Sequence, residues 1–441
     1  MRTAVLCWCL GLGSALALDP LLAAAAADGE TARAALPADE ESLVQYALQH
    51  NPELQAARWS GTAADAAVTS AGALANPVVR AEWLHVQAPD DYGFGIGLEW
   101  TPPMPGVYGA RREAAHAGAR AAHADLEEHA AELEASVRLA YAEARAWAER
   151  LELLERSVRT RRALQEATRA RMQRGAANRI DLSLASVGLA RAEQEQARSA
   201  LSASAAVAQI ERLIGLAPEQ RLQLAPPDAA PAAGGEGSAA HEPEDGELVR
   251  QALASRPQLQ ADRERQTVAE QALSAQRAKR WPWLELQARY RRHDQSAHSD
   301  DFTLGASISI PLPGHESGPI AALEADLERE RTLARAHRDE LQREIRTLQE
   351  ERARYAEISA HYAESIAPVL SEHATLVKAA LAGLELDLTA LLTAEEMVTQ
   401  GGLEYLQARL ATRRAEIALE RSLGRYGRDR PKAEPLTKAE P

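Results

Sequence analysis

The stretch LVQYALQHNPELQA at residues 43–56 returns as LVRQALASRPQLQA at residues 248–261, so positions recur 205 residues later. Further along the chain the offset becomes 208, which pairs Phe94 with Phe302. Self-similarity at a fixed period indicates a repeat architecture before any single residue is considered. The sequence therefore predicts two copies of one unit, in which a helix, a β-hairpin, a long helix and a return helix follow one another.

The composition is typical of long helices packed side by side. Of the 441 residues 46% are hydrophobic, only two are Phe, and the formal net charge is −14. A chain rich in Ala, Glu, Arg and Leu favours extended helices over a thick globular core. A nucleic-acid surface would need a basic face, so nucleic acid is excluded as a partner.

Residues 1–27 are interpreted as a secretory signal peptide. A short positive start precedes an apolar run from Ala4 to Leu18, which is too short to span a membrane. Cys7 and Cys9 are the only cysteines and fall inside this segment. The exported chain is therefore expected to need neither disulfides nor thiol chemistry.

Two regions change their hydrophobic period from 3.6 to 2. Apolar residues alternate with small or polar ones over residues 94–101, and more sharply over 284–290 and 302–310. We expect β-hairpins at 78–102 and 283–311. Each strand has roughly ten residues, enough to cross a bilayer as a tilted strand with lipid-facing and lumen-facing side chains in alternation. An ordinary half-buried sheet in a soluble domain is the alternative.

The aromatic residues favour the membrane interpretation of these hairpins. Trp100 and Trp281 stand at strand ends, where an interfacial girdle would place them. Four of the seven Trp fall in or beside the hairpins and are candidate membrane-interface residues: Trp83, Trp100, Trp281 and Trp283.

Very long helices are expected after each hairpin. Residues Val107 to Arg171 would extend roughly 98 Å and Pro319 to Leu381 roughly 95 Å at 1.5 Å per residue. Leu43 to Ala75 and Leu182 to Leu216 would extend roughly 50 Å each. Two half-length helices stacked end to end would thus match one long helix, and Asn51-Pro52 predicts a kink or a fresh helix start in the first of them.

These patterns divide the chain into repeats and connections. The first repeat is expected over residues 40–216 and the second over 247–424. Residues 217–246 are rich in Pro, Ala and Gly and are interpreted as a linker or equatorial segment. The polar residues 425–441 are expected to be a disordered tail.

The order of these elements resembles the TolC-type outer membrane efflux proteins over about residues 40–424. The resemblance rests on the signal peptide, the duplication, one hairpin per half, and the wordings ALxxxPxL at 47–54 and Pro-Leu-Pro at 311–313. It implies a mainly α fold with transmembrane β structure: a long α-helical barrel below a twelve-stranded outer-membrane β-barrel, to which each chain of a homotrimer contributes four strands. Oligomerisation also follows from physics, because open strand edges in lipid would leave backbone groups unpaired.

The same resemblance implies a location and partners. The chain would sit in the cell outer membrane, in contact with its lipid, and extend into the periplasm, where its helical tips would dock a periplasmic adaptor linked to an inner-membrane pump. The matching tip residues are Arg174, Gly175, Gly383 and Leu384. Both glycines are expected to cap helix ends in the left-handed conformation.

Aspartate rings constrict the closed tip in the best-known family members. The gate candidates implied for this chain are Asp181 in the first copy and Glu385 and Asp387 in the second. The sequence departs from the family pattern at the position equivalent to Asp181, where Thr389 stands.

Catalytic, cofactor and metal motifs are absent from the sequence. It has no Ser-His-Asp arrangement, phosphate-binding glycine loop or recognisable carboxylate pair, so neither enzymatic activity nor a cofactor is expected. His116, His123 and His129 are spaced by seven and six residues, whereas a helical metal site wants ligands three or four apart.

We therefore expect a passive exit duct, the outer-membrane channel of a tripartite efflux system. Its cargo, whether a drug, a heavy metal or a protein, stays open. The alternative is a periplasmic coiled-coil scaffold or adaptor. An adaptor would flank one helical hairpin with β-rich halves, which the duplicated order does not predict.

Overall fold

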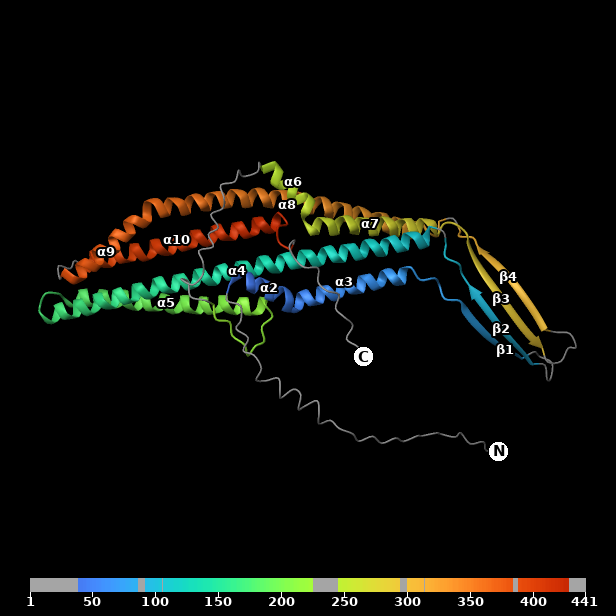
Figure 1. The fold of residues 1–441 in the computed structure, drawn as a ribbon, viewed down its shortest axis with the longest axis horizontal. Coiled ribbons are helices and arrows are strands. Elements are labelled where there is room, and N and C mark those ends of the chain that lie inside the picture. The colour runs from blue at the N-terminus through green and yellow to red at the C-terminus, as the bar shows by residue number, and fades with distance from the viewer. Residues whose placement is uncertain are drawn as a thin grey trace, which may run out of the picture.

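The computed structural model is an elongated molecule with helices along most of its length and a β-sheet at one end (Figure 1). It describes residues 39–85, 92–104, 106–224, 245–293, 300–312, 314–383 and 388–427. The expected signal peptide, most of the expected linker and most of the expected tail lie outside these ranges. The predicted fold class, mainly helical with four strands, is confirmed.

The first repeat begins with two helices that meet at Asn51, where the sequence predicted a kink or a fresh helix start. Pro52 has no N–H and disfavours helical geometry in the preceding residue, so Asn51 is extended with ψ of 124°. The Asn51 side chain then caps the new helix by accepting a hydrogen bond from Leu54 N at 2.9 Å. The helices are α2 (Glu40–His50), α3 (Pro52–Ala71), α4 (Val107–Gln173) and α5 (Arg179–Leu213).

The second repeat breaks at the equivalent place and once more inside its long helix. The long helix expected over 319–381 is interrupted by a π-helical turn. Its elements are α6 (Asp245–Ser255), α7 (Pro257–Ala278), α8 (Ser317–His361), the π-helix η2 (Tyr362–Ile366), α9 (Ala367–Gly383) and α10 (Leu388–Ser422).

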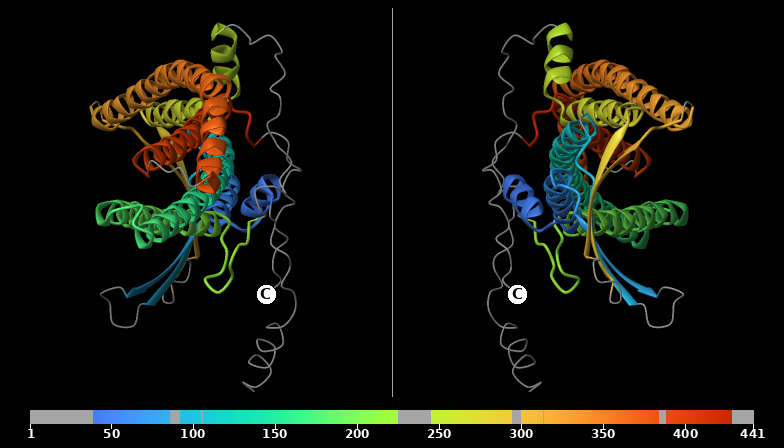
Figure 2. Two further views of the ribbon diagram at one scale, coloured as in Figure 1. Left: turned by 90° about the vertical axis from the view of Figure 1, so that its left-hand side faces the viewer. Right: turned by 90° about the vertical axis from the view of Figure 1, so that its right-hand side faces the viewer.

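Shorter helices follow one another along the long ones. α3 and α5 lie in succession along α4, while α7 and α10 lie between α4 and α8 (Figure 1). At 20 and 35 residues α3 and α5 extend roughly 30 and 52 Å, against roughly 100 Å for α4. α3 is shorter than expected because α2 is a separate helix, which stands to one side of α3 and α4 (Figure 2).

A joint of the same design closes each repeat. In the first, Asn51 Nδ2 donates to the carbonyl oxygen of Leu213 at 2.9 Å. In the second, Ser255 Oγ donates to the carbonyl oxygen of Leu423 at 2.9 Å. Each return helix therefore ends against the break between the two N-terminal helices of its own repeat.

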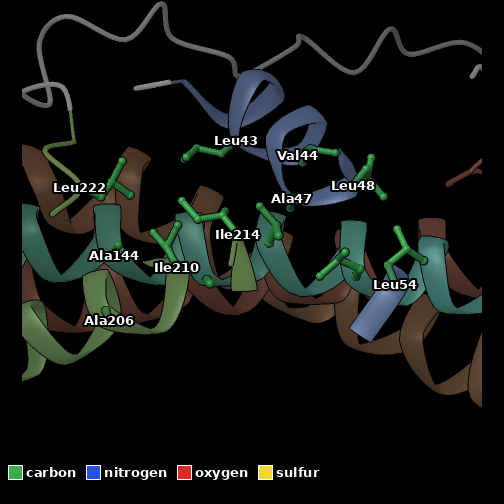
Figure 3. Packing of buried hydrophobic residues seen from close by; sticks show 13 residues of the cluster. Leu43, Val44, Ala47, Leu48, Leu54, Ala144, Ala206, Ile210, Ile214 and Leu222 are labelled. Carbon is green, nitrogen blue, oxygen red and sulfur yellow. The ribbon is translucent and has the colours of Figure 1, made fainter. Parts of the chain in front are cut away.

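The core is thin and follows these joints. Leu43 and Ala47 of α2 are fully buried and point toward Ile210 and Ile214 at the end of α5 (Figure 3). Their spacing of four residues puts both on one face of α2. Burial of this face against α4 and α5 fixes the position of α2.

Charged side chains hold the N-terminal end of α2. Glu40 accepts hydrogen bonds from Arg138 of α4 at 3.0 Å and from Arg413 of α10 at 3.1 Å. Burial disfavours the charged form of Arg138, but its bonds to Glu40 and Glu134 outweigh burial and raise its pKa above the ordinary value. The guanidinium therefore stays charged, and Glu40 joins α2 to both α4 and α10.

The two hairpins form one sheet. Its strands are all antiparallel and ordered β1 (Val78–His85), β2 (Tyr92–Trp100), β3 (Trp283–His293) and β4 (Asp300–Ser309). The central pairing, in which Ile96 lies opposite Tyr290, joins the first repeat to the second. The sheet thus unites the hairpins of both copies.

Candidate functional site

The register of the sheet sorts its side chains into two chemically distinct faces. Ala81 lies opposite Ile96, Ile96 opposite Tyr290, and Tyr290 opposite Phe302, which makes one apolar row across all four strands. Successive residues of a strand point to opposite faces, so neighbouring rows extend this surface. The apolar face comprises Val79, Ala81, Trp83, Phe94, Ile96, Leu98, Trp100, Leu284, Leu286, Ala288, Tyr290, Phe302, Leu304, Ala306 and Ile308.

The chain itself does not cover the apolar face. Leu304 is 74% exposed, and Val79 and Ile308 are each 64% exposed. The sheet stands beyond the helices (Figure 1). A contiguous exposed apolar surface of this extent marks a membrane or protein interaction site.

The candidate interface tryptophans lie at both ends of the sheet. Trp83 lies at the end remote from the helices, beside Phe94 with ring centroids 6.3 Å apart. Trp100 lies at the helical end and donates from Nε1 to the carbonyl oxygen of Ala75. Trp281, 73% exposed, precedes β3, and Trp283 opens that strand on the polar face. Their contact with lipid headgroups stays a prediction.

The opposite face of the sheet is polar and charged. Arg80 of β1 pairs with Glu99 of β2 at 3.0 Å. Beside them, β2 presents glycines to the long side chains of β3: a Cβ added to Gly95 would lie 3.1 Å from Arg291 Cγ. A polar face of this kind suits the lumen of a membrane barrel.

The outer strands β1 and β4 leave two open edges. Each pairs with a strand of the sheet on one side only, β1 with β2 and β4 with β3. In lipid, the unpaired N–H and C=O groups of both edges would each cost several kcal/mol, about 2–7 by transfer measurements. The sheet is therefore incomplete as a membrane-spanning unit.

The first-repeat tip is a tight turn closed by a reciprocal cap. Gly175 has φ of 76°, as predicted for a left-handed helix end. Asp181 Oδ2 accepts from Asn178 N at 3.0 Å while Asn178 Oδ1 accepts from Asp181 N at 2.9 Å. The gate candidate Asp181 thus also forms the capping box of α5, a role that the spacing of Asn178 and Asp181 signals.

The remaining tip candidates are only partly described. Arg174 is exposed and donates from Nε to the carbonyl oxygen of Ala170 at 3.2 Å. Gly383 is the last residue of α9. Leu384, Glu385 and Asp387 lie outside the described residues, so their gate and docking roles stay predictions.

A buried polar cluster, absent from the sequence predictions, ties α10 to α4 in the tip half. Arg161 Nε lies 2.7 Å from Glu395 Oε2, with side chains 12% and 7% exposed. Glu395 Oε1 accepts from Ser157 Oγ at 2.6 Å and from Thr399 Oγ1 at 3.0 Å. No motif marks this cluster, because only the fold brings residues more than 230 positions apart into contact.

One of the three histidines of α4 contacts the neighbouring helix α3. His123 Nε2 lies 3.1 Å from Asp65 Oδ1 of α3. Within the described ranges, no group of three or more His, Cys, Asp or Glu side chains could hold a metal ion. In the same part of the chain, no helix is both long and apolar enough to traverse a bilayer.

The sequence matches one family model. Residues 43–216, which cover α2 to α5 and the first hairpin, match the model described as outer membrane efflux protein. Among curated proteins, no significant match is found.

Several solved outer-membrane channels share the fold. The outer-membrane channel OprN has a TM-score of 0.74 at 20% identity, over 87% of this chain and 89% of that one. CusC has a TM-score of 0.73 at 16% identity, over 87% and 92%. VceC from Vibrio cholerae has a TM-score of 0.71 at 19% identity, over 87% and 96%. At these identities the likeness establishes the fold.

Proposed function

We propose that the chain belongs to the outer membrane efflux proteins, whose family model matches residues 43–216, and that three copies form a passive exit duct of a tripartite efflux system. The sheets of the three chains would close a twelve-stranded barrel in the outer membrane. The helices would continue it as a tunnel in the periplasm, where a periplasmic adaptor would connect the tips to an inner-membrane pump.

The observation that carries this proposal is the two-faced sheet with open edges. One face is apolar and exposed, the other carries Arg80, Glu99 and Arg291, and β1 and β4 lack outer partners. The apolar face suits contact with lipid, and the charged face suits a water-filled lumen. Strands of neighbouring chains would pair with the two open edges. The alternative, a soluble periplasmic scaffold, gives no role to the apolar face.

Cysteine pairs across neighbouring edges test the closed barrel. Neither Cys7 nor Cys9 belongs to the expected mature chain, so Arg80→Cys of β1 can be combined in turn with Asp301→Cys, Thr303→Cys or Ser307→Cys of β4. All four positions lie on the polar face. Oxidation in outer membranes should yield covalent dimers and trimers on denaturing gels for one of these combinations, because closure brings β4 of one chain beside β1 of the next.

Ala81→Cys provides the matched control, since it lies next to Arg80 but on the apolar face. It should not cross-link to the same β4 positions. A purified mature chain that stays a monomer without detergent, with no cross-link in any combination, would refute the barrel and favour the scaffold.

The first-repeat tip is the proposed docking end. Ile180 is 69% exposed and Leu184 48% exposed on the first turns of α5, close to Arg174 and Gly175. An added Cβ at Gly175 would meet nothing within 4 Å. This open turn with exposed apolar neighbours offers a surface to an adaptor, together with the second-repeat candidates Gly383 and Leu384.

Asp181 is a proposed gate residue, and two substitutions separate its charge from its capping role. Asp181→Asn removes the charge but keeps an acceptor for Asn178 N, whereas Asp181→Ala removes both. If three copies constrict the tip, both variants should raise conductance in planar bilayers at 0.1 M salt. The gain should shrink at 1 M, where the Debye length falls from about 10 Å to about 3 Å.

A role confined to capping predicts a different pattern. Conductance would then stay unchanged in both variants, and only Asp181→Ala would lose stability, by about 0.5–2 kcal/mol. Equal conductance in both variants and the parent would therefore end the gate assignment of Asp181, leaving Glu385 and Asp387 as the candidates.

A further inference from the structure

The π-helical turn opens a gap beside α10. A π turn adds one residue to a helical turn and shifts the side chains that follow out of α-helical register. Ile358 on one side of η2 is 53% exposed, and Ile366 at its end is 38% exposed. The equivalent long helix α4 runs without such a break from Val107 to Gln173. Among the described residues, this break in a long helix is therefore particular to the second repeat.

Close packing holds the two sides of this gap in place. The rings of Tyr362 and Tyr405 stack with centroids 4.8 Å apart and an angle of 13°. A Cβ added to Gly401 of α10 would lie 2.6 Å from Leu370 Cδ1 of α9. Since α9 approaches α10 so closely beyond the stacked rings, the gap has fixed walls.

The gap is a crease of about 340 Å³ with an apolar wall and an acidic rim. Ile358, Ile366 and Ala408 supply apolar surface, and Tyr362 supplies an aromatic side chain. His361 also lines the crease, and its Nδ1 lies 3.4 Å from Ser365 Oγ. Glu357 of α8 and Glu404 of α10 stand at the rim. The volume lies at the small end of the range for ligand pockets, about 300–1,000 Å³.

The two rim carboxylates have no cationic partner. Glu404 accepts from the neutral amide of Gln400 at 2.9 Å. Among the described residues, no Arg or Lys forms an ion pair with Glu357 or Glu404. The nearest guanidinium along α10, that of Arg409, is engaged by Glu149 of α4 at 2.9 Å. Burial and the neighbouring Glu404 raise the pKa of Tyr362, which agrees with a negative local potential.

We propose that this crease binds a small organic cation with an apolar body. The carboxylates at the rim would offset the charge of the ligand, the Tyr362 ring would contribute a cation–π contact, and the isoleucines would cover its hydrocarbon part. This role goes beyond passive conduction, because the helical part of the protein would bind organic cations in preference to neutral or anionic solutes. It does not require the barrel to be closed.

Titration with benzyltrimethylammonium tests the site. Saturation-transfer NMR on the detergent-purified mature protein should show saturable binding of this probe. Neutral benzyl alcohol and anionic benzoate should bind at least about tenfold more weakly, because the rim is acidic. Glu357→Gln or Glu404→Gln should each weaken the probe about three- to fivefold, and the double variant about tenfold or more.

Glu396→Gln is the matched control. Glu396 lies on α10 two turns before Glu404 and is exposed, so the variant loses the same charge elsewhere. Its probe affinity should equal that of the parent. Unchanged affinity in Glu357→Gln/Glu404→Gln, or equal binding of benzyl alcohol, would overturn the proposal. Loss of the trimer in the double variant, measured by light scattering, would overturn it too by identifying the crease as a subunit contact.

Discussion

Replacing Glu395 with alanine should lower the free energy of unfolding by about 3–5 kcal/mol. The change leaves Arg161 buried with no counter-charge, and it removes the acceptor of Ser157 and Thr399. A charge that has lost both water and its partner costs far more than the pair contributed by itself. Denaturant titration of the purified protein, followed by far-ultraviolet circular dichroism, measures the difference.

Two further variants show whether burial causes this loss. Glu396→Ala changes the next residue, which is exposed, and should stay within about 0.5 kcal/mol of the parent. Replacing the pair together, as Arg161→Met/Glu395→Leu, should recover most of the stability, because no isolated charge remains. If Glu395→Ala behaved like Glu396→Ala, the contact between α4 and α10 would not be closed in solution.

Gly215→Ala should destabilise the protein by about 3 kcal/mol or more. Gly215 follows α5 at φ of 71°, where a side chain costs about 1–2 kcal/mol. Its added Cβ would also lie 2.8 Å from the carbonyl oxygen of His50 and 3.2 Å from Pro52 Cδ. Because the first neighbour is backbone, relief requires the joint between α2, α3 and α5 to open. The loss should be visible in the same denaturant titration.

Gly175→Ala separates clash from strain. Gly175 has nearly the same backbone, with φ of 76°, but an added Cβ there meets nothing within 4 Å. Its substitution should cost only the conformational term of about 1–2 kcal/mol. Equal losses at Gly215 and Gly175 would mean that the joint tolerates the methyl group, and that it is looser than the distance to His50 indicates.

The duplicated elements could be predicted because their signals are local. Strand alternation over 302–310 and the proline stops set the hairpins, and helical periodicity set α4 within about two residues of its observed end. The joint at Asn51 was also signalled, since Pro52 restricts its neighbour. These features need no knowledge of what lies across the fold.

Features created by contacts between distant segments could not be predicted. Glu395 looks like a surface residue beside Glu396, and only the approach of α4 buries it. The π turn at Tyr362 interrupts a helix that the sequence predicted to be continuous over 319–381. The charge of Asp181 suggested a gate, whereas its hydrogen bonds also make it a cap.

The paired joints have a consequence for how quickly the chain can fold. Asn51 reaches Leu213 across 162 positions, and Ser255 reaches Leu423 across 168. Contacts between such distant positions slow folding, because the chain loses loop-closure entropy before the contact contributes any favourable free energy. α4 can form from local contacts as soon as its residues are available. The joint of each repeat, in contrast, cannot form until the last helix of that repeat is present. A chain that is exported from its amino terminus therefore cannot form the Asn51–Leu213 contact until nearly half of it has crossed the inner membrane. The Ser255–Leu423 contact cannot form until residue 423 has followed.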